Sequence, residues 1–134
     1  MTQDGHLAIS GNADLVMVRQ QVRVVAVEAG LSLIDQTKIV TAASELARNA
    51  LIHAGGGRVS IVVVEDGRRR GLRLTFSDEG PGIPDLDRAL TDGFTTAGGL
   101  GLGLGGSRRL VDEFDVASAP GKGTTITATK WARG

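Results

Sequence analysis

Stretches with helical and strand-like patterns are grouped in blocks along this 134-residue chain, and the grouping limits the folds that it can adopt. After a short strand-like segment at 7–10, apolar residues at every third or fourth position predict helices over 12–29 and about 32–54. Four strand-like segments follow, at 59–64, 72–76, 114–118 and 124–130. Strict alternation of strands and helices would favour a doubly wound sheet, whereas these blocks predict an α+β two-layer sandwich formed by one domain over residues 1–134.

Residues with strong positional preferences mark the ends of these elements. Asn12 is the expected N-cap of the first helix, Gly30 follows its last turn, and Ser32 or Asp35 is expected to cap the second helix. The dipeptide Asp66-Gly67 lies between two strand-like segments, and it therefore predicts that they form a hairpin.

A long segment at 79–102 separates this hairpin from the last strands. It is rich in glycine and holds two of the three prolines of the chain, so we expect a loop with a short helix near 86–90. Loops of this length in compact domains usually have a function, such as covering a bound ligand as a lid. A helix at 107–113 and a turn at Pro120-Gly121 are expected after the loop.

Composition argues against several classes of function. The 15 basic and 15 acidic residues leave no net charge, and aromatic residues make up only 3%, so nucleic-acid binding is not expected. The absence of cysteine excludes disulfides and thiolate metal sites. No segment reaches the ~18 apolar residues of a membrane span, and we therefore expect a cytoplasmic protein with no membrane partner. The one basic run, Arg68-Arg69-Arg70, is interpreted as a solvated hairpin turn rather than a phosphate-binding patch.

Three polar residues of the second predicted helix, Glu45, Asn49 and His53, are spaced four apart and therefore share one stripe. A carboxylate and an amide oxygen on one face suit Mg²⁺, which prefers oxygen ligands. The carboxylate can also take the proton from an attacking hydroxyl. A polar helix edge without a further role explains the same spacing, and His53 fits a structural or capping role better than a catalytic one.

Asp78 follows a predicted strand and begins the motif Asp78-Glu79-Gly80-Pro81-Gly82. An ionised carboxylate only accepts hydrogen bonds, so it can select an exocyclic amine such as N6 of adenine. Gly80 and Gly82 let the backbone approach a flat ring where a side chain would clash. The alternative interpretation of this motif is a tight turn.

Glycine also dominates residues 98–106, immediately before a predicted helix. Free backbone N–H groups at a helix N-terminus bind phosphate well, although a flexible hinge has the same composition. Residues 101–106 match the dinucleotide fingerprint G-x-G-x-x-G, which we reject because the motif follows a loop rather than a strand. Residues 121–124 are not a Walker loop. A threonine that opens the last strand could complete an adenine pocket beside Asp78, or it could simply favour the strand.

In this order the four motifs resemble those of the GHKL ATP-binding superfamily, which includes gyrase, the Hsp90 chaperone, MutL and the histidine kinases. The matching segments are 45–53, 78–82, 99–103 and 121–125. The resemblance covers nearly the whole chain and implies the Bergerat fold, in which a mixed β-sheet is layered on helices and ATP lies under a lid. The short chain and Phe94-Thr95-Thr96 resemble small serine kinases that regulate bacterial sigma factors, and residues 108–114 and 121–131 resemble the stressosome switch kinases among them.

The resemblance also assigns roles to residues. It implies that Glu45 is the catalytic base, that Asn49 is the Mg²⁺ ligand and contacts the nucleotide, and that Asp78 binds adenine. The other residues implied to bind ATP or ADP are Gly80, Gly82, Ile83, Thr95, Thr96, Gly99, Leu100, Gly101, Leu102, Gly103 and Thr125. Arg19 and Arg23 of the first helix are implied to face a protein partner, and a solvated helix face explains them equally well.

The implied function is a serine/threonine-protein kinase that phosphorylates STAS-domain proteins of the stressosome and then activates a PP2C-type phosphatase by direct contact. One alternative is an anti-sigma factor kinase that also sequesters a sigma factor and phosphorylates its STAS-domain antagonist. Another is a nucleotide-gated binding module, which the presence of both a base and a cation ligand disfavours. A detached histidine-kinase domain is disfavoured because the sequence shows no phosphoacceptor helix. The sequence leaves open whether the chain forms a homodimer.

Overall fold

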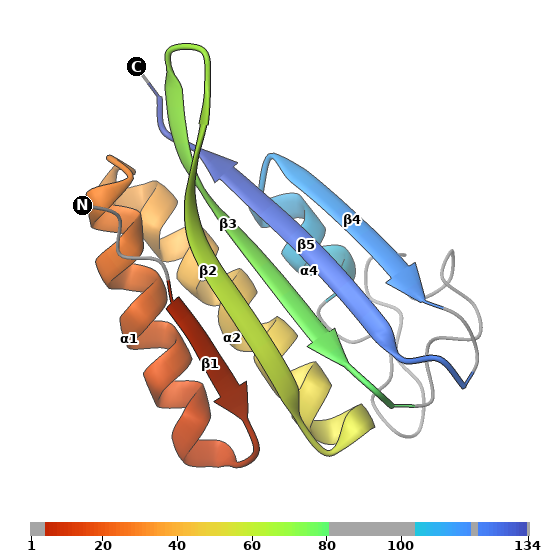
Figure 1. Cartoon of the computed structure of the whole chain (residues 1–134). Helices are drawn as coiled ribbons and strands as arrows, with labels where there is room; N and C mark the ends of the chain where they lie inside the picture. Colours follow the sequence, from red (N-terminus) through yellow and green to blue (C-terminus); the bar gives the residue numbers. More distant parts are fainter. Residues whose placement is uncertain (1–4, 81–103, 119–120, 134) are drawn as a thin grey trace.

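The computed structural model describes residues 5–80, 104–118 and 121–133, which form a five-stranded sheet and three helices (Figure 1). The strands are β1 (Gly5–Ile9), β2 (Gly57–Asp66), β3 (Arg69–Asp78), β4 (Glu113–Ser118) and β5 (Thr124–Trp131). The helices are α1 (Asn12–Glu28), α2 (Leu33–Ala54) and α4 (Leu104–Leu110). These helices all lie behind the sheet in Figure 1, and this arrangement confirms the predicted α+β two-layer sandwich.

The strands follow the order β1-β2-β3-β5-β4 across the sheet. All four strand pairs in the described ranges are antiparallel, so the expectation of a mixed sheet is wrong for this part of the chain. The connections explain two of these pairs. A tight turn joins β2 to β3 and a short segment joins β4 to β5, and short connections require antiparallel neighbours.

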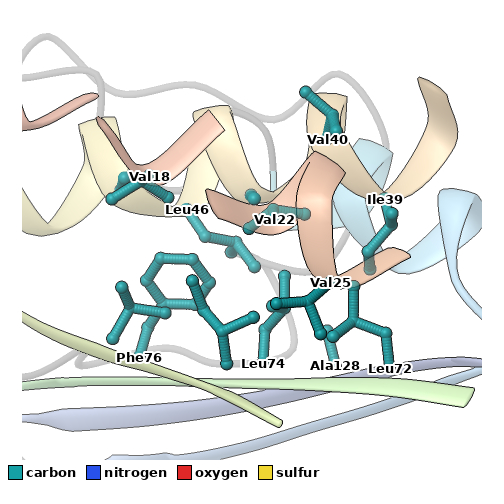
Figure 2. Packing of buried hydrophobic residues seen from close by; sticks show 14 of the residues in the cluster. Val18, Val22, Val25, Ile39, Val40, Leu46, Leu72, Leu74, Phe76 and Ala128 are labelled. Carbon is teal, nitrogen blue, oxygen red and sulfur yellow. The ribbon is translucent and has the colours of Figure 1, made fainter. Parts of the chain in front are cut away.

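The core lies between the sheet and the helices because apolar residues alternate along the strands. Leu72, Leu74 and Phe76 occupy alternate positions of β3, and each is at least 97% buried. Figure 2 shows these side chains facing the apolar residues of the helices, which include Val18, Val22, Val25, Ile39 and Leu46. The intervening residues of β3 point to the other face of the sheet, which no helix of the described ranges covers.

The start of α1 differs from the prediction by one residue. Gly11 is the N-cap, and Asn12 is the first helical residue. The Asp14 carboxylate accepts hydrogen bonds from the backbone N–H of Ser10 at 2.8 Å and of Gly11 at 3.1 Å. The bond from the Ser10 backbone, followed by one from its hydroxyl, holds the pKa of Asp14 below its usual value. The cap is therefore supplied by a residue inside the helix, which the sequence preference for Asn12 did not indicate.

The ends of α2 agree with the prediction. The hydroxyl of Ser32 accepts a hydrogen bond from the backbone N–H of Asp35 at 3.2 Å, so Ser32 rather than Asp35 caps the helix. At the other end Gly55 adopts a left-handed conformation with φ of 72°, which favours glycine. Both ends of the helix that carries Glu45 and Asn49 are thus fixed by local interactions.

The basic run lies at the exposed end of the β2–β3 hairpin, as predicted, although two of its three residues belong to β3. Arg69 donates to Asp66 at 2.7 Å, and its guanidinium lies 4.2 Å from the centroid of the Trp131 ring. Arg70 lies 3.4 Å from a carboxylate oxygen of Glu65. These ion pairs within the hairpin support the interpretation as a solvated turn.

The helix α4 lies three residues earlier in the chain than the predicted helix at 107–113. The backbone N–H of Asp112 donates to the carbonyl of Thr129, and the Asp112 carboxylate accepts from the backbone N–H of Trp131 at 2.7 Å. These bonds draw the chain from the helix into β4, so Glu113 starts a strand instead of ending a helix. The short helix expected near 86–90 and most of the loop at 79–102 lie outside the described residues, as does Pro120.

None of the helices in the described ranges is both long enough and apolar enough to span a membrane.

Candidate active site

The three polar residues of the α2 stripe are placed as the spacing predicted. Glu45, Asn49 and His53 all lie in the second half of α2, and all three are half-buried. The carboxylate of Glu45 lies 3.6 Å from Arg48, and about a third of its side chain is exposed. The preceding residue, Ser44, accepts a hydrogen bond from Arg19 of α1 at 3.3 Å. The Glu45 carboxylate is therefore accessible to a substrate, and the bond between Arg19 and Ser44 joins its helix to α1.

Asp78 is the last residue of β3, and its carboxylate has a defined orientation. Oδ1 accepts a hydrogen bond from the backbone N–H of Gly80 at 3.0 Å. This bond closes an Asx turn, a local structure that aspartate favours. No hydrogen bond or ion pair to Oδ2 occurs among the residues that the structure describes. One oxygen of Asp78 is thus held by the backbone, and the other can accept a hydrogen bond from a bound ring.

Gly80 lies where the end of α2 comes close to Asp78. A Cβ atom at Gly80 would lie 2.5 Å from Cβ of Ala54, the last residue of α2, and 3.3 Å from Oδ1 of Asp78. The close approach of β3 to the end of α2 therefore requires glycine at this position. The sequence predicted a glycine here for approach to a ligand, which stays a prediction, and the structure shows that a glycine permits the close approach of the Asp78 turn to the end of α2.

Gly123 has an equivalent role on the other side of Asp78. Its φ of 77° is left-handed, and a Cβ atom there would overlap the backbone carbonyl of Asp78. The backbone of the last motif therefore packs directly on the backbone of Asp78. Two motifs more than forty residues apart in sequence therefore meet at one end of the neighbouring inner strands β3 and β5.

The register of β5 places Thr124, not Thr125, beside Asp78. Asp78 is the direct cross-strand neighbour of Thr124, whereas Thr125 pairs with Ser77. Neighbours across a ladder point to the same face of a sheet, so Thr124 shares the helix-covered face with Asp78. Thr125 points to the other face and is exposed, while Thr124 is 92% buried. The structure thus does not bring Thr125 to the candidate site, and we infer that Thr124 takes its place.

The two adjacent threonines provide a matched pair of variants. We expect Thr124→Ala to weaken ATP binding about 3- to 10-fold, because one hydrogen bond contributes about 0.5–1.5 kcal/mol. Thr125→Ala should leave the dissociation constant unchanged within error. Isothermal titration calorimetry with ATP distinguishes the two. If Thr125→Ala causes the larger loss, the original assignment from the motif is correct and the one from the register is wrong.

Of the ten other site residues predicted from the sequence, nine lie outside the described residues and one lies within them. The ones that lie outside the described residues are Gly82, Ile83, Thr95, Thr96, Gly99, Leu100, Gly101, Leu102 and Gly103. The tenth, Gly80, is described above. The residue that follows this segment, Leu104, begins α4, which packs against α2. The structure therefore has a helix directly after the glycine-rich segment 99–103, which itself lies outside the described residues.

Two buried polar atoms, one in α2 and one in α4, belong to residues that the sequence analysis did not assign a function. Nε2 of His53 in α2 and Oγ of Ser107 in α4 have no hydrogen-bond partner within the described ranges. Ser107 is 99% buried although it belongs to a short helix with polar neighbours. Apolar periodicity gives no signal for such a residue, because the helix has only seven residues.

A cavity of about 410 Å³ lies at the end of β3, beside Asp78. Its lining residues are Ala8, Ala54, Gly56, Gly57, Arg58, Asp78 and Glu79. Glu45 and Asn49 do not line it, so the cavity contains only the Asp78 side of the candidate site. The segment expected to hold the phosphates, 99–103, is outside the described residues.

Comparisons with known proteins show which family the chain resembles. Residues 34–133 match the family HATPase_c, described as histidine kinase-, DNA gyrase B- and HSP90-like ATPase. The chain is 50% identical over 120 residues to the serine/threonine-protein kinase RsbT of Bacillus subtilis, covering 90% of each chain. It is 40% identical over 104 residues to the anti-sigma F factor of Bacillus licheniformis, covering 72% of this chain and 69% of the relative.

A solved structure is similar as well. It contains the RsbU and RsbW domains of Rv1364c from Mycobacterium tuberculosis, with a TM-score of 0.67 and 25% sequence identity. The similarity covers 98% of this chain and 33% of the other, so this chain spans about a third of that protein's length.

The chain belongs to the HATPase_c family, which confirms the resemblance to the GHKL superfamily. Within the family it is a serine/threonine-protein kinase of a sigma-factor regulatory pathway. The family is one of ATPases, and the predicted use of ATP follows from membership in it.

Proposed function

We propose that this kinase phosphorylates a serine or threonine on STAS-domain proteins of the stressosome and then changes partner to activate a PP2C-type phosphatase. The observation that carries the proposal is the close approach of Gly80, two residues after Asp78, to Ala54 at the end of α2, the helix whose second half also holds Glu45 and Asn49. This approach supports the proposal that the helix with the base and the strand with the adenine-binding carboxylate contribute to one site. A module that only bound nucleotide would have no need for the base.

The transfer requires little covalent chemistry from the protein. The hydroxyl oxygen of the substrate serine or threonine attacks the γ-phosphorus of ATP, the bond from that phosphorus to the bridging oxygen breaks, and ADP leaves. Glu45 accepts the hydroxyl proton. Asn49 is the residue that would hold Mg²⁺, because its amide oxygen is a suitable ligand and lies one turn from Glu45. When bound, Mg²⁺ neutralises charge on the phosphates.

Asp78→Asn should separate nucleotide binding from chemistry. Asparagine keeps the size of the side chain but puts an N–H donor where the amine of adenine also donates. We expect ATP and ADP affinity to fall by about 10- to 150-fold, which corresponds to the ~1.5–3 kcal/mol of a charged hydrogen bond. Calorimetric titration with ADP measures the effect. An Asp78→Asn protein that binds ADP normally would show that Asp78 does not read the base.

A groove between the two long helices supports the proposal of protein partners. It has a volume of about 690 Å³, and Val24 and Val27 of α1 line it together with Val40 of α2. Val24 is 48% exposed and Val27 is 58% exposed, so the groove presents neighbouring apolar side chains at the surface. Arg19 and Arg23 line the same groove. Exposed apolar residues beside arginine are common at protein–protein interfaces, so we assign this groove to partner binding.

A second function is favoured by the relatives named anti-sigma F factor. In this alternative the kinase sequesters a sigma factor and phosphorylates a STAS-domain antagonist of that complex. The chemistry at Glu45 and Asp78 is the same, and only the partner differs.

The partner switch distinguishes the two functions. Purified kinase is added to a PP2C-type phosphatase, with and without an unphosphorylated STAS-domain stressosome protein, and phosphatase turnover is measured. We expect stimulation that the STAS protein suppresses and that ATP with Mg²⁺ restores. Stable co-elution with a sigma factor, without stimulation of the phosphatase, would favour the anti-sigma kinase.

A further inference from the structure

Ser118, the last residue of β4, lies beside the threonine that the register brings to Asp78. Asp78, Thr124 and Ser118 are direct neighbours on β3, β5 and β4, and they therefore form one row on the helix-covered face of the sheet. The oxygens of the Ser118 and Thr124 hydroxyls lie 2.9 Å apart. Ser118 Oγ also lies 3.1 Å from the carbonyl oxygen of Gly123, to which it donates.

The number of hydroxyl protons fixes the direction of these bonds. A serine or threonine hydroxyl has one proton to donate and two lone pairs that accept. The carbonyl of Gly123 can only accept, so the proton of Ser118 lies in that bond. The 2.9 Å contact must then use the proton of Thr124, which donates to Ser118 Oγ. The Thr124 oxygen consequently presents lone pairs, and no proton, to its surroundings.

Asp78, like Thr124, presents only hydrogen-bond acceptors. Its Oδ1 accepts from the N–H of Gly80, and a carboxylate offers only lone pairs to a ligand. Two neighbouring side chains on one face thus both act as acceptors. A ring that presents an amine satisfies such a pair, whereas a ring that presents a carbonyl at the same position would oppose its lone pairs to theirs.

We propose that Ser118 is a positioning residue that determines the preference for 6-amino over 6-oxo purine nucleotides by fixing the Thr124 hydroxyl as an acceptor. The proposal rests on the proposed nucleotide site, and it adds the residue that sets the polarity of that site. Ser118 acts through Thr124 and need not touch the base. Without Ser118 the Thr124 hydroxyl can rotate and donate to a carbonyl, so the discrimination against 6-oxo purines decreases.

The test is the ratio of the dissociation constants for ITP and ATP, which differ in the 6-oxo and 6-amino group. We expect Ser118→Ala to lower this ratio about 3- to 10-fold, the range for one hydrogen bond. Ser118→Thr keeps a hydroxyl at the same position and should retain the ratio of the unmodified protein. Thr125→Ala, on the opposite face of the sheet, should also leave it unchanged. Binding is measured by calorimetry for each nucleotide and each protein.

The outcomes separate this proposal from the proposed function. Loss of affinity for ATP and ITP by the same factor in Ser118→Ala would mean that Ser118 only supports the fold of the turn, and the proposal would be wrong. A ratio unchanged by Ser118→Ala would also contradict it. If the unmodified protein binds neither nucleotide, the nucleotide site itself fails. A reduced ratio in Ser118→Ala that Ser118→Thr does not share supports the proposal.

Discussion

Glu45→Gln is expected to transfer phosphate about 10²–10⁴-fold more slowly than the unmodified kinase, which is the usual contribution of a general base. Glutamine has nearly the shape of glutamate and cannot take the proton of the incoming hydroxyl. Nucleotide affinity should change by less than about twofold, because the base acts on the protein substrate and Asp78 holds the adenine. Single-turnover transfer to a STAS-domain protein and titration with ADP measure the two quantities separately.

A control variant tests whether the charge of any exposed glutamate has this effect. Glu65 lies at the end of the β2–β3 hairpin, far along the sheet from Asp78, with 69% of its side chain exposed. Glu65→Gln also removes one negative charge, and we expect it to transfer at the normal rate. If Glu45→Gln transfers phosphate as fast as Glu65→Gln, Glu45 is not the base and the polar edge of α2 has only a structural role.

Among the substitutions proposed for this protein, Lys130→Met is expected to lower the free energy of unfolding most, by about 3–5 kcal/mol. Lys130 of β5 is 97% buried, and its ammonium lies 3.6 Å from Asp35 of α2 and 3.3 Å from Asp112. Asp35 is buried to the same extent. Removal of the lysine leaves the Asp35 carboxylate inside the protein, and Arg133, at 3.4 Å, is then its one ion-pair partner among the residues that the structure describes. The expected loss is a large part of the ~5–15 kcal/mol that stabilises a typical domain.

Urea unfolding of two further variants distinguishes the buried charge from other effects of the substitution. Lys122→Met changes an exposed lysine and should alter the free energy of unfolding by less than about 0.5 kcal/mol. The double variant Asp35→Leu with Lys130→Met removes both buried charges and should recover most of the loss, because apolar residues often replace a buried ion pair without cost. A loss below ~1 kcal/mol in Lys130→Met alone would mean that the ion pair does not hold α2 to the sheet.

Local patterns were sufficient to predict most of the fold. The two long helices, the Asp66-Gly67 hairpin and the final pair of strands follow from periodicity and turn residues, and the structure has all of them. The end of α4 was misplaced because Asp112 forms its hydrogen bonds with β5, which lies elsewhere in the sequence. The ion pair of Asp35 with Lys130 is equally invisible to a local pattern, since 95 residues of sequence separate the two.

In the candidate site, too, local patterns predicted some features, whereas others depend on contacts between distant parts of the sequence. The stripe of Glu45 and Asn49 needs only helical spacing, and the position of Asp78 at the end of a strand needs only the strand pattern. The choice between Thr124 and Thr125 needs more. Adjacent residues of a strand point to opposite faces, and a shift of one residue in the register would exchange them. Only the pairing of β5 with β3 decides which threonine shares a face with Asp78.

The most direct test of the proposed kinase activity is transfer of label from [γ-³²P]ATP, with Mg²⁺, to a purified STAS-domain stressosome protein, with Glu45→Gln assayed in parallel. We expect label on serine or threonine of the STAS protein with the unmodified kinase, and loss of nearly all of it with Glu45→Gln. Nucleotide binding without any transfer to that protein would contradict the proposed substrate. Equal labelling by both kinases would contradict the role of Glu45.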